Sequence, residues 1–227
     1  VFGLGESNME AILHDMMAES KNPTIAPYAK TSECFARVTA KADTPEECEK
    51  LLDPVVEKIC AMLGEDVYGV DVDSLEQVVG DGLRQRGMTL AVAESCTGGL
   101  LSKRITDVPG CSDYYLGGVC SYANEVKMKV LGVQKETLDT VGAVSPEVAE
   151  QMAEGVARAL GADVGVGITG VAGPGGGTDE KPVGLVYISI WHKGQHFTRK
   201  MKSMNGRDRI RMQAASTALD LIRRNVF

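Results

Sequence analysis

The sequence contains no hydrophobic run long enough to cross a membrane. A spanning helix needs about 20 consecutive apolar residues, and no segment of the 227-residue chain approaches that length. The first residues, V-F-G-L-G-E-S, lack the basic and apolar regions of a signal peptide. We therefore expect a soluble, cytoplasmic protein without a membrane partner. The start on Val rather than Met predicts a processed end or a longer native protein.

Basic residues are also in short supply. The chain has 24 Lys and Arg against 31 Asp and Glu, which gives a net charge of −7 and a pI near 5.1. Proteins that bind nucleic acid through its phosphates carry more Lys and Arg than Asp and Glu. Nucleic acid is therefore not an expected partner, although a small anionic ligand could still meet a local basic pocket.

The cysteines and histidines are few and poorly spaced for metal binding. Six cysteines form neither a C-x-x-C pair nor a zinc-ribbon spacing, so we expect reduced thiols and no metal site. Of the three histidines, His14 lies in the first part of the chain, and His192 and His196 flank Lys193-Gly194 in a predicted hairpin turn. We expect the last two to be solvated, which leaves few candidates for a histidine base.

The first part of the chain, residues 1–73, reads as a small α/β domain. Met9 to Met16 has the spacing of an amphipathic helix, residues 33–40 alternate like a half-buried strand, and Thr44 caps a second helix. Residues 65–71 are predicted as another strand. Residues 22–30, N-P-T-I-A-P-Y-A-K, contain two prolines and are predicted as a turn or extended loop.

A second domain, residues 74–227, follows a boundary near Asp71 to Ser74. Ser74 caps a helix that Gly87 ends. The predicted elements after it are strand 88–93, helix 100–105, strand 115–122, helix 124–132, helix 145–161 with Ser145 as its cap, strand 162–170, strands 183–191 and 196–203, and a final helix from about Arg207. This alternation predicts a three-layer α/β/α fold, with helices on both faces of a mixed sheet. Ligands in such sheets bind beyond the carboxyl ends of the strands.

The segment from Glu94 to Gly99, E-S-C-T-G-G, has that position, between a predicted strand and a predicted helix. Ser95 or Cys96 would lie near a helix N-terminus, where unpaired N–H groups stabilise negative charge. A nucleophile, an oxyanion hole and a phosphate cradle all remain open. So does a plain helix cap followed by glycines for close packing. The hydrolase pattern G-x-S-x-G is absent.

A lysine could replace the missing histidine base. S-Y-A-N-E-V-K places Tyr122, Asn124 and Lys127 at a strand-to-helix junction, with Asn124 as the expected N-cap. A lysine acts as a base only if its pKa, about 10.4 when free, falls by about 3 units through burial or a neighbouring cation. The alternative is an ordinary surface lysine on a helix.

Two further segments could bind a ligand. Residues 168–177, I-T-G-V-A-G-P-G-G-G, would let the backbone approach a phosphate or a planar ring, but match neither G-x-G-x-x-G nor the P-loop. Arg207, Arg209 and Arg211 begin the last predicted helix. Arg207 and Arg211 share a face that suits an anionic group, or form a solvated helix end.

Taken together, A-E-S-C-T-G-G, V-P-G-C-S-D-Y-Y-L-G-G-V-C-S-Y-A-N-E-V-K, G-A-V-S-P-E-V-A, G-I-T-G-V-A-G-P-G-G and K-P-V-G-L-V resemble the C-terminal domain of the CinA family of competence/damage-inducible proteins. The resemblance runs from about Ser74 to the C-terminus. The first segment resembles the KH-type middle domain of that family but has no G-x-x-G loop, so RNA binding there is not expected. No counterpart of the family's N-terminal molybdopterin-binding-like domain is found.

The resemblance implies a nicotinamide-nucleotide amidase, which converts nicotinamide mononucleotide and water to nicotinate mononucleotide and ammonia. It implies Ser95 as nucleophile, Lys127 as base and Tyr122 as an assisting or orienting group. It also implies a homodimer, and neither a metal nor a cofactor. Cys96 remains the alternative nucleophile, since a thiol is intrinsically more reactive. The predicted substrate-binding residues are Cys96, Thr97, Gly98, Gly99, Asn124, Thr169, Gly170, Gly173, Arg207 and Arg211, with the arginines on the phosphate.

Two other functions compete with the amidase. One is a regulatory module that senses a nucleotide without turning it over, in a competence/damage-inducible protein. The other is nucleic-acid binding through the small domain, which the negative net charge disfavours. Intact Ser95, Tyr122 and Lys127 favour the enzyme.

Overall fold

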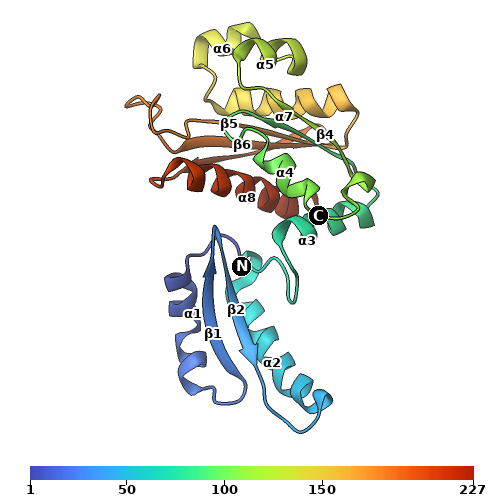
Figure 1. The fold of residues 1–227 in the computed structure, drawn as a ribbon, viewed down its shortest axis with the longest axis vertical. Coiled ribbons are helices and arrows are strands. Elements are labelled where there is room, and N and C mark those ends of the chain that lie inside the picture. Colours follow the sequence, from blue (N-terminus) through green and yellow to red (C-terminus); the bar gives the residue numbers. More distant parts are fainter. The chain divides into compact units, whose positions relative to one another are not determined.

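The computed structural model describes residues 1–227, and the chain divides into two compact units, Val1–Asp71 and Val72–Phe227. Figure 1 shows that each unit has its own sheet and its own helices. No helix in the structure combines the length and the apolar character needed to cross a membrane.

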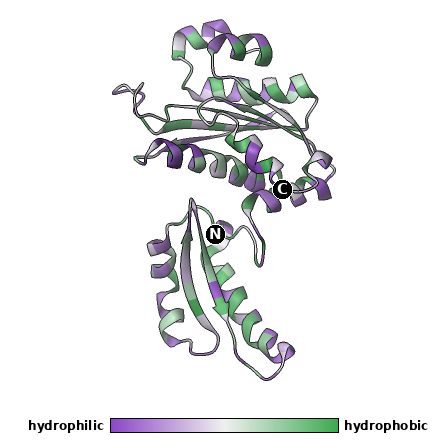
Figure 2. Ribbon diagram, viewed as in Figure 1, coloured by the Kyte–Doolittle hydropathy of each residue, from purple (hydrophilic) through white to green (hydrophobic).

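The first unit packs two helices against a two-stranded antiparallel sheet. Its elements are α1 (Glu6–Glu19), β1 (Thr24–Lys30), β2 (Glu33–Thr39), α2 (Pro45–Leu63) and the short 3-10 helix η1 (Gly64–Asp66). The buried side chains that form its core are Met9, Leu13, Ile25, Cys34, Ile59 and Leu63. In Figure 2, hydrophilic and hydrophobic residues alternate along α2, as expected of a helix with one buried face.

Two predictions for this unit were wrong. Residues 22–30 were expected as a loop, but Thr24–Lys30 forms β1, with Pro27 opposite Ala36. A two-stranded sheet has only edge strands, where a proline is tolerated because its missing N–H can face away from the partner. Residues 65–71 were expected as a strand, but only η1 forms there, and the sheet pairs β1 with β2 alone. The Thr44 cap is confirmed, since its side chain accepts from the Glu47 N–H.

The second unit contains a five-stranded mixed sheet in the order β4-β3-β5-β6-β7. Its strands are β3 (Leu90–Glu94), β4 (Tyr115–Cys120), β5 (Val164–Gly170), β6 (Leu185–His192) and β7 (Gln195–Lys202). β3 runs parallel to β4 and β5, whereas β6 is antiparallel to both β5 and β7. The parallel strands therefore lie together on one side of the sheet, and their carboxyl ends share one edge.

Helices cover both faces of this sheet, which confirms the predicted α/β class (Figure 1). The helical elements are α3 (Leu75–Gln85), α4 (Leu100–Thr106), the 3-10 helix η2 (Cys111–Asp113), α5 (Asn124–Leu131), α6 (Lys135–Val141), α7 (Pro146–Leu160) and α8 (Arg207–Val226). α7 packs on one face with α5 and α6 beyond it, and α8, α4 and α3 lie on the other. All five residues of β3, an interior strand of the sheet, are buried, and all but the last, Glu94, are apolar.

Glycines in β5 bring α7 unusually close to the sheet. A Cβ at Gly165 would lie 2.0 Å from the Ala153 carbonyl oxygen, and one at Gly167 would lie 2.1 Å from the Ala149 carbonyl oxygen. Both distances are far below van der Waals contact. The absence of a side chain at these two positions therefore fixes how closely the helix packs on the strand.

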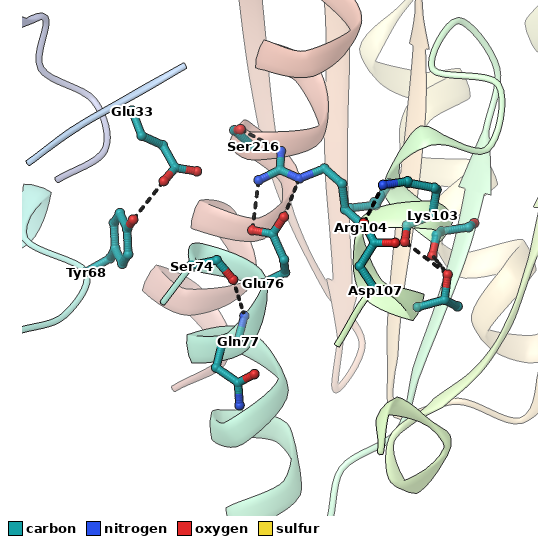
Figure 3. Close-up of polar contacts among 12 residues, drawn as sticks. Glu33, Tyr68, Ser74, Glu76, Gln77, Lys103, Arg104, Asp107 and Ser216 are labelled. Atoms are coloured by element: carbon teal, nitrogen blue, oxygen red, sulfur yellow. Dashed lines mark hydrogen bonds and ion pairs between the residues drawn. The ribbon is translucent and has the colours of Figure 1, made fainter. Parts of the chain in front are cut away.

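An ion pair ties α3, α4 and α8 together on the other face. The Arg104 guanidinium donates to both carboxylate oxygens of Glu76, at 2.7 and 2.9 Å, and its Nη1 donates to Ser216 Oγ at 2.7 Å (Figure 3). The Arg104 and Glu76 side chains are only 14% and 15% exposed. Such a bidentate ion pair fixes the orientation of both side chains.

The helix caps in this unit were mostly predictable. The side chains of Ser74 and Ser145 accept from N–H groups in the first turns of α3 and α7, as predicted. Asn124 was expected to cap α5, but it is the first helical residue, and Ala123 occupies the cap position without a side-chain bond. His192 was expected in a solvated turn, but it is buried at the end of β6, where Nδ1 pairs with the Asp163 carbonyl oxygen at 3.1 Å.

Candidate active site at the carboxyl ends of the parallel strands

Ser95 follows β3 directly and is held between the two neighbouring strands. Its N–H donates to the Ile168 carbonyl oxygen of β5 at 3.0 Å, and the Ser121 N–H after β4 donates to the Glu94 carbonyl oxygen at 2.8 Å. The chain therefore leaves the sheet at a fixed point and turns toward α4. This is the edge where parallel α/β sheets bind ligands.

Glu94 lies at the candidate site but was not among the predicted site residues. Its side chain is 1% exposed and accepts four hydrogen bonds at the start of α4. Oε2 accepts from the Gly99 and Leu101 N–H groups, both at 3.0 Å, and Oε1 accepts from the Ser102 N–H and hydroxyl, at 2.8 and 2.7 Å. A carboxylate thus already occupies this helix N-terminus, which disfavours a phosphate cradle there. The signal in the sequence was an acidic residue shortly before a helix start.

Lys127 is buried, contrary to the alternative of a surface lysine. Its side chain is 1% exposed, and its Nζ lies 3.2 Å from Ser95 Oγ, 2.6 Å from the Ser121 carbonyl oxygen and 3.3 Å from the Tyr122 carbonyl oxygen. Burial lowers the pKa of this amine below its ordinary value, and a negative charge on Cys96 would oppose that effect. The structure therefore brings Ser95 and Lys127 together and favours the neutral form of the lysine.

The hydrogen bonds of Lys127 aim its lone pair at the serine. A neutral amine has two N–H donors and one lone pair, and a carbonyl oxygen can only accept. When Ser121 and Tyr122 take the two N–H groups, Ser95 is the one partner able to donate to Nζ. This arrangement suits a base that removes the proton from the Ser95 hydroxyl.

Cys96, the alternative nucleophile, lies in an unfavourable environment. Its side chain is 5% exposed, and burial raises the pKa of its thiol to about 11, although the Arg211 charge acts in the opposite direction. The thiolate is the reactive form of cysteine. The same desolvation that favours the neutral, basic form of Lys127 therefore suppresses the reactive form of Cys96.

Only part of the turn after Ser95 has N–H groups available for an oxyanion. The Gly98 N–H donates to the Ser95 carbonyl oxygen at 3.1 Å, and the Gly99 N–H donates to Glu94. Cys96 and Thr97 are left as the N–H groups of this turn without a backbone acceptor. Gly98 and Gly99 have φ values of +58° and +92°, which side chains rarely adopt, so glycine is needed to make the turn.

The first turn of α8 reaches the same edge of the sheet. Arg207 Nη1 donates to the Gly173 carbonyl oxygen at 2.6 Å and Nη2 to Tyr122 Oη at 3.5 Å. Arg211 Nη2 donates to the Thr97 carbonyl oxygen at 2.7 Å. Both arginines therefore contact segments predicted to belong to the site. Tyr122 is 65% exposed, so its ring is accessible from solvent.

The other predicted residues are less directly involved. Thr169 is buried at the end of β5, and its hydroxyl donates to the Ala143 carbonyl oxygen at 2.7 Å. Gly170 follows it and is half-buried. Asn124 is exposed at the start of α5, two residues after Tyr122. These three residues lie at the strand ends or just beyond them, but no hydrogen bond connects their side chains to Ser95 or Lys127.

The fold and the site define a class: α/β proteins in which a serine after a parallel strand meets a buried lysine. Comparisons with known proteins add the family. A model described as the CinA C-terminal domain matches residues 72–226, and one described as the damage-inducible protein CinA KH domain matches residues 1–69. The chain belongs to the CinA family.

Relatives of known sequence match the whole chain. A CinA-like protein of Dictyoglomus thermophilum is 48% identical over 227 residues, which is 100% of this chain and 55% of the relative. A CinA-like protein of Desulfovibrio desulfuricans is 51% identical over 228 residues, which covers 99% of this chain and 53% of the relative. The chain thus spans about half the length of the curated relatives it matches.

Solved structures match a smaller part of the chain. The competence/damage-inducible protein of Agrobacterium tumefaciens has a TM-score of 0.65 and 38% identity, covering 69% of this chain and 96% of its own. A CinA superfamily protein of Klebsiella pneumoniae has a TM-score of 0.65 and 32% identity, covering 68% of this chain and 98% of its own. Proteins of this fold therefore exist that are about as long as the second unit alone.

Proposed function

We propose that the second domain hydrolyses the carboxamide of nicotinamide mononucleotide, giving nicotinate mononucleotide and ammonia. The observation that carries this proposal is the contact between Ser95 Oγ and the buried Nζ of Lys127, at 3.2 Å. The choice of an amide substrate rests on the resemblance to CinA C-terminal domains. The proposal places all catalytic groups in the domain predicted over residues 74–227.

In the first half of the reaction, Ser95 Oγ attacks the carboxamide carbon and Lys127 Nζ takes the hydroxyl proton. The carbonyl oxygen becomes an oxyanion, which the Cys96 and Thr97 N–H groups are free to bind. When the C–N bond breaks, the Lys127 ammonium returns a proton to the leaving nitrogen, which departs as ammonia. The product is an ester between Ser95 and the nicotinoyl group, and Lys127 is neutral again.

In the second half, water attacks the ester carbon while Lys127 takes one of its protons. Collapse of this intermediate breaks the bond to Ser95 Oγ, which recovers the proton from Lys127. The acid nicotinate mononucleotide is released. Two smaller barriers replace the large barrier to direct amide hydrolysis.

The nucleotide part of the substrate would be held by α8 and the neighbouring loops. We propose that Arg207 and Arg211 bind the substrate phosphate, since both guanidinium groups reach the ends of the strands. Tyr122 is assigned to the substrate side of the site, because its exposed hydroxyl lies 3.5 Å from Arg207 Nη2. A homodimer is part of the same proposal through the family resemblance.

The test is an assay of both products from one sample. Purified protein is incubated with nicotinamide mononucleotide, with and without a chelator, and ammonia and nicotinate mononucleotide are measured together. We expect equal amounts of the two products in both arms. Binding of the nucleotide without turnover would instead support the regulatory module, and turnover that the chelator abolishes would contradict the Ser/Lys mechanism.

A further inference from the structure

Ser121 has a buried hydroxyl that makes no hydrogen bond. The residue follows β4 and is 0% exposed, and its Oγ has no partner in the structure. Both of its backbone groups, in contrast, are hydrogen-bonded. The N–H donates to the Glu94 carbonyl oxygen, and the carbonyl oxygen accepts from Lys127 Nζ. An unpaired buried hydroxyl costs stability, so its presence calls for an explanation.

The number of protons on Lys127 changes during the proposed reaction. The neutral amine has two N–H groups, which the Ser121 and Tyr122 carbonyl oxygens accept. The ammonium has three. In the free protein the third can point to Ser95 Oγ, but once Ser95 is acylated that atom is an ester oxygen and a poor acceptor. The ammonium that forms during attack on the ester must turn its new N–H from the attacking oxygen to Ser95 Oγ, and between these two positions this N–H lacks a good acceptor.

We propose that Ser121 is a positioning residue whose hydroxyl accepts the third N–H of the Lys127 ammonium while Ser95 is acylated. This inference rests on the proposed function. The Ser121 carbonyl oxygen is already 2.6 Å from Nζ, and rotation about the single χ1 bond moves Oγ among three staggered positions around the same Cα. The hydroxyl has free lone pairs because nothing else in the structure binds it.

Other groups near Lys127 do not meet this need. The Lys127 side-chain amine hydrogen-bonds to Ser95, Ser121 and Tyr122. Cys96 is the titratable group whose charge acts on Lys127, and its thiol, with a pKa of about 11, stays neutral at lower pH. Thr97 Oγ1 is also buried and unpaired, but its residue makes no hydrogen bond to the lysine. Ser121 alone combines a free acceptor with a contact to Nζ.

The decisive experiment measures the Lys127 pKa without any substrate. Lysine labelled with 13C at Cε is titrated by NMR in Ser95→Ala and in Ser95→Ala/Ser121→Ala, with Lys127→Met identifying the signal. Removing Ser95 Oγ removes the acceptor that acylation would also remove, so Ser121 should take its place. We expect the second substitution to lower the proton affinity of Lys127 by about tenfold, as loss of one hydrogen bond to a charged group does. Equal pKa values in the two variants would overturn the inference.

Stability and kinetics separate this role from a structural one. Because its hydroxyl is unpaired, Ser121→Ala should unfold at a temperature no lower than the wild type. The matched control is Ser216→Ala, which removes a buried hydroxyl that accepts a hydrogen bond from Arg104. This substitution should lower the midpoint temperature of thermal unfolding. A midpoint for Ser121→Ala lowered as much as that of the control would refute the positioning role.

In the nucleotide assay, Ser121→Ala should lower kcat at least tenfold and leave KM within about twofold, since a group acting through the base affects proton transfer rather than binding. An unchanged kcat in an active protein would contradict the inference. An inactive wild type would contradict the proposed function, and the NMR comparison would still decide the role of Ser121.

Discussion

At the scale of single residues, burial assigns opposite roles to two neighbouring candidates. Both Lys127 and Cys96 are desolvated, and desolvation favours the neutral form of each. A neutral lysine is a base, whereas a neutral thiol is a weak nucleophile. One physical effect therefore favours the Ser95–Lys127 pair and disfavours Cys96.

The first prediction concerns pH. Because Lys127 must be neutral to accept the serine proton, kcat/KM should be low below its pKa and rise as pH increases through it. Since burial lowers that pKa from 10.5, the rise should be centred below that value. The profile of kcat/KM reports the free enzyme, and Lys127→Arg, which keeps the charge but cannot become neutral, serves as the inactive control. An activity independent of pH from 6 to about 10 would argue against a lysine base.

At the scale of helices and strands, the site depends on how two elements are anchored. Glu94 caps α4 through four hydrogen bonds, and the glycines of β5 let α7 pack closely on the sheet. The first feature fixes the start of α4 after β3, and the second fixes the distance between β5 and α7. Substitutions at these positions test whether the anchoring is structural.

Glu94→Gln should lower the free energy of unfolding by about 2 to 3 kcal/mol. The amide replaces one accepting oxygen with an NH₂ group that faces donors, and hydrogen bonds to a buried charge are the stronger kind. Urea denaturation measures the loss, with Glu125→Gln on the exposed start of α5 as a control expected to change little. Equal stability of the Glu94 variant and the wild type would show that the carboxylate does not anchor α4.

Gly167→Ala should lower stability by at least about 1 to 3 kcal/mol, the usual cost of overpacking. The added Cβ would meet the Ala149 carbonyl oxygen at 2.1 Å, so strand and helix would have to separate. Gly175→Ala is the matched control, because a Cβ there meets nothing within 4 Å. The two midpoints of thermal unfolding should differ clearly, and equal midpoints would contradict the close packing.

Most features that follow from a local sequence pattern were predicted, whereas features that depend on contacts between distant parts of the chain were mostly missed. The caps at Ser74 and Ser145 and the strand β3, apolar up to Glu94, are local patterns and were predicted. β1 was missed because Pro23 before it and Pro27 within it suggest a loop, and only pairing with β2 makes it a strand. α6 was not predicted. The Ser95–Lys127 contact was expected from family resemblance. The Glu94 cap had a local signal, an acidic residue before a helix start, whereas the unpaired Ser121 hydroxyl depends on tertiary packing that no local pattern encodes.

At the scale of the whole molecule, the candidate site is confined to one compact unit. Ser95, Tyr122, Lys127, Arg207 and Arg211 all lie within Val72–Phe227. The solved CinA superfamily structures from Agrobacterium tumefaciens and Klebsiella pneumoniae are matched over 96% and 98% of their own chains while covering 69% and 68% of this one. None of the candidate site residues named above lies in the first unit.

We predict that residues 72–227 produced alone will fold cooperatively and keep the kcat of the full chain within about threefold, since no catalytic group is removed. Circular dichroism with thermal unfolding checks the fold, and the nucleotide assay checks activity. A folded fragment without activity would show that the first unit takes part in the reaction.

The most direct test of the central claim compares Ser95→Ala, Lys127→Met and Cys96→Ala in the same assay of ammonia release from nicotinamide mononucleotide. The account predicts that the first two lose at least about 10³-fold in kcat, as nucleophile and base variants do, while Cys96→Ala keeps kcat within about threefold. Loss of turnover in Cys96→Ala with activity retained in Ser95→Ala would contradict the account, because the thiol rather than the Ser95 hydroxyl would then be the nucleophile.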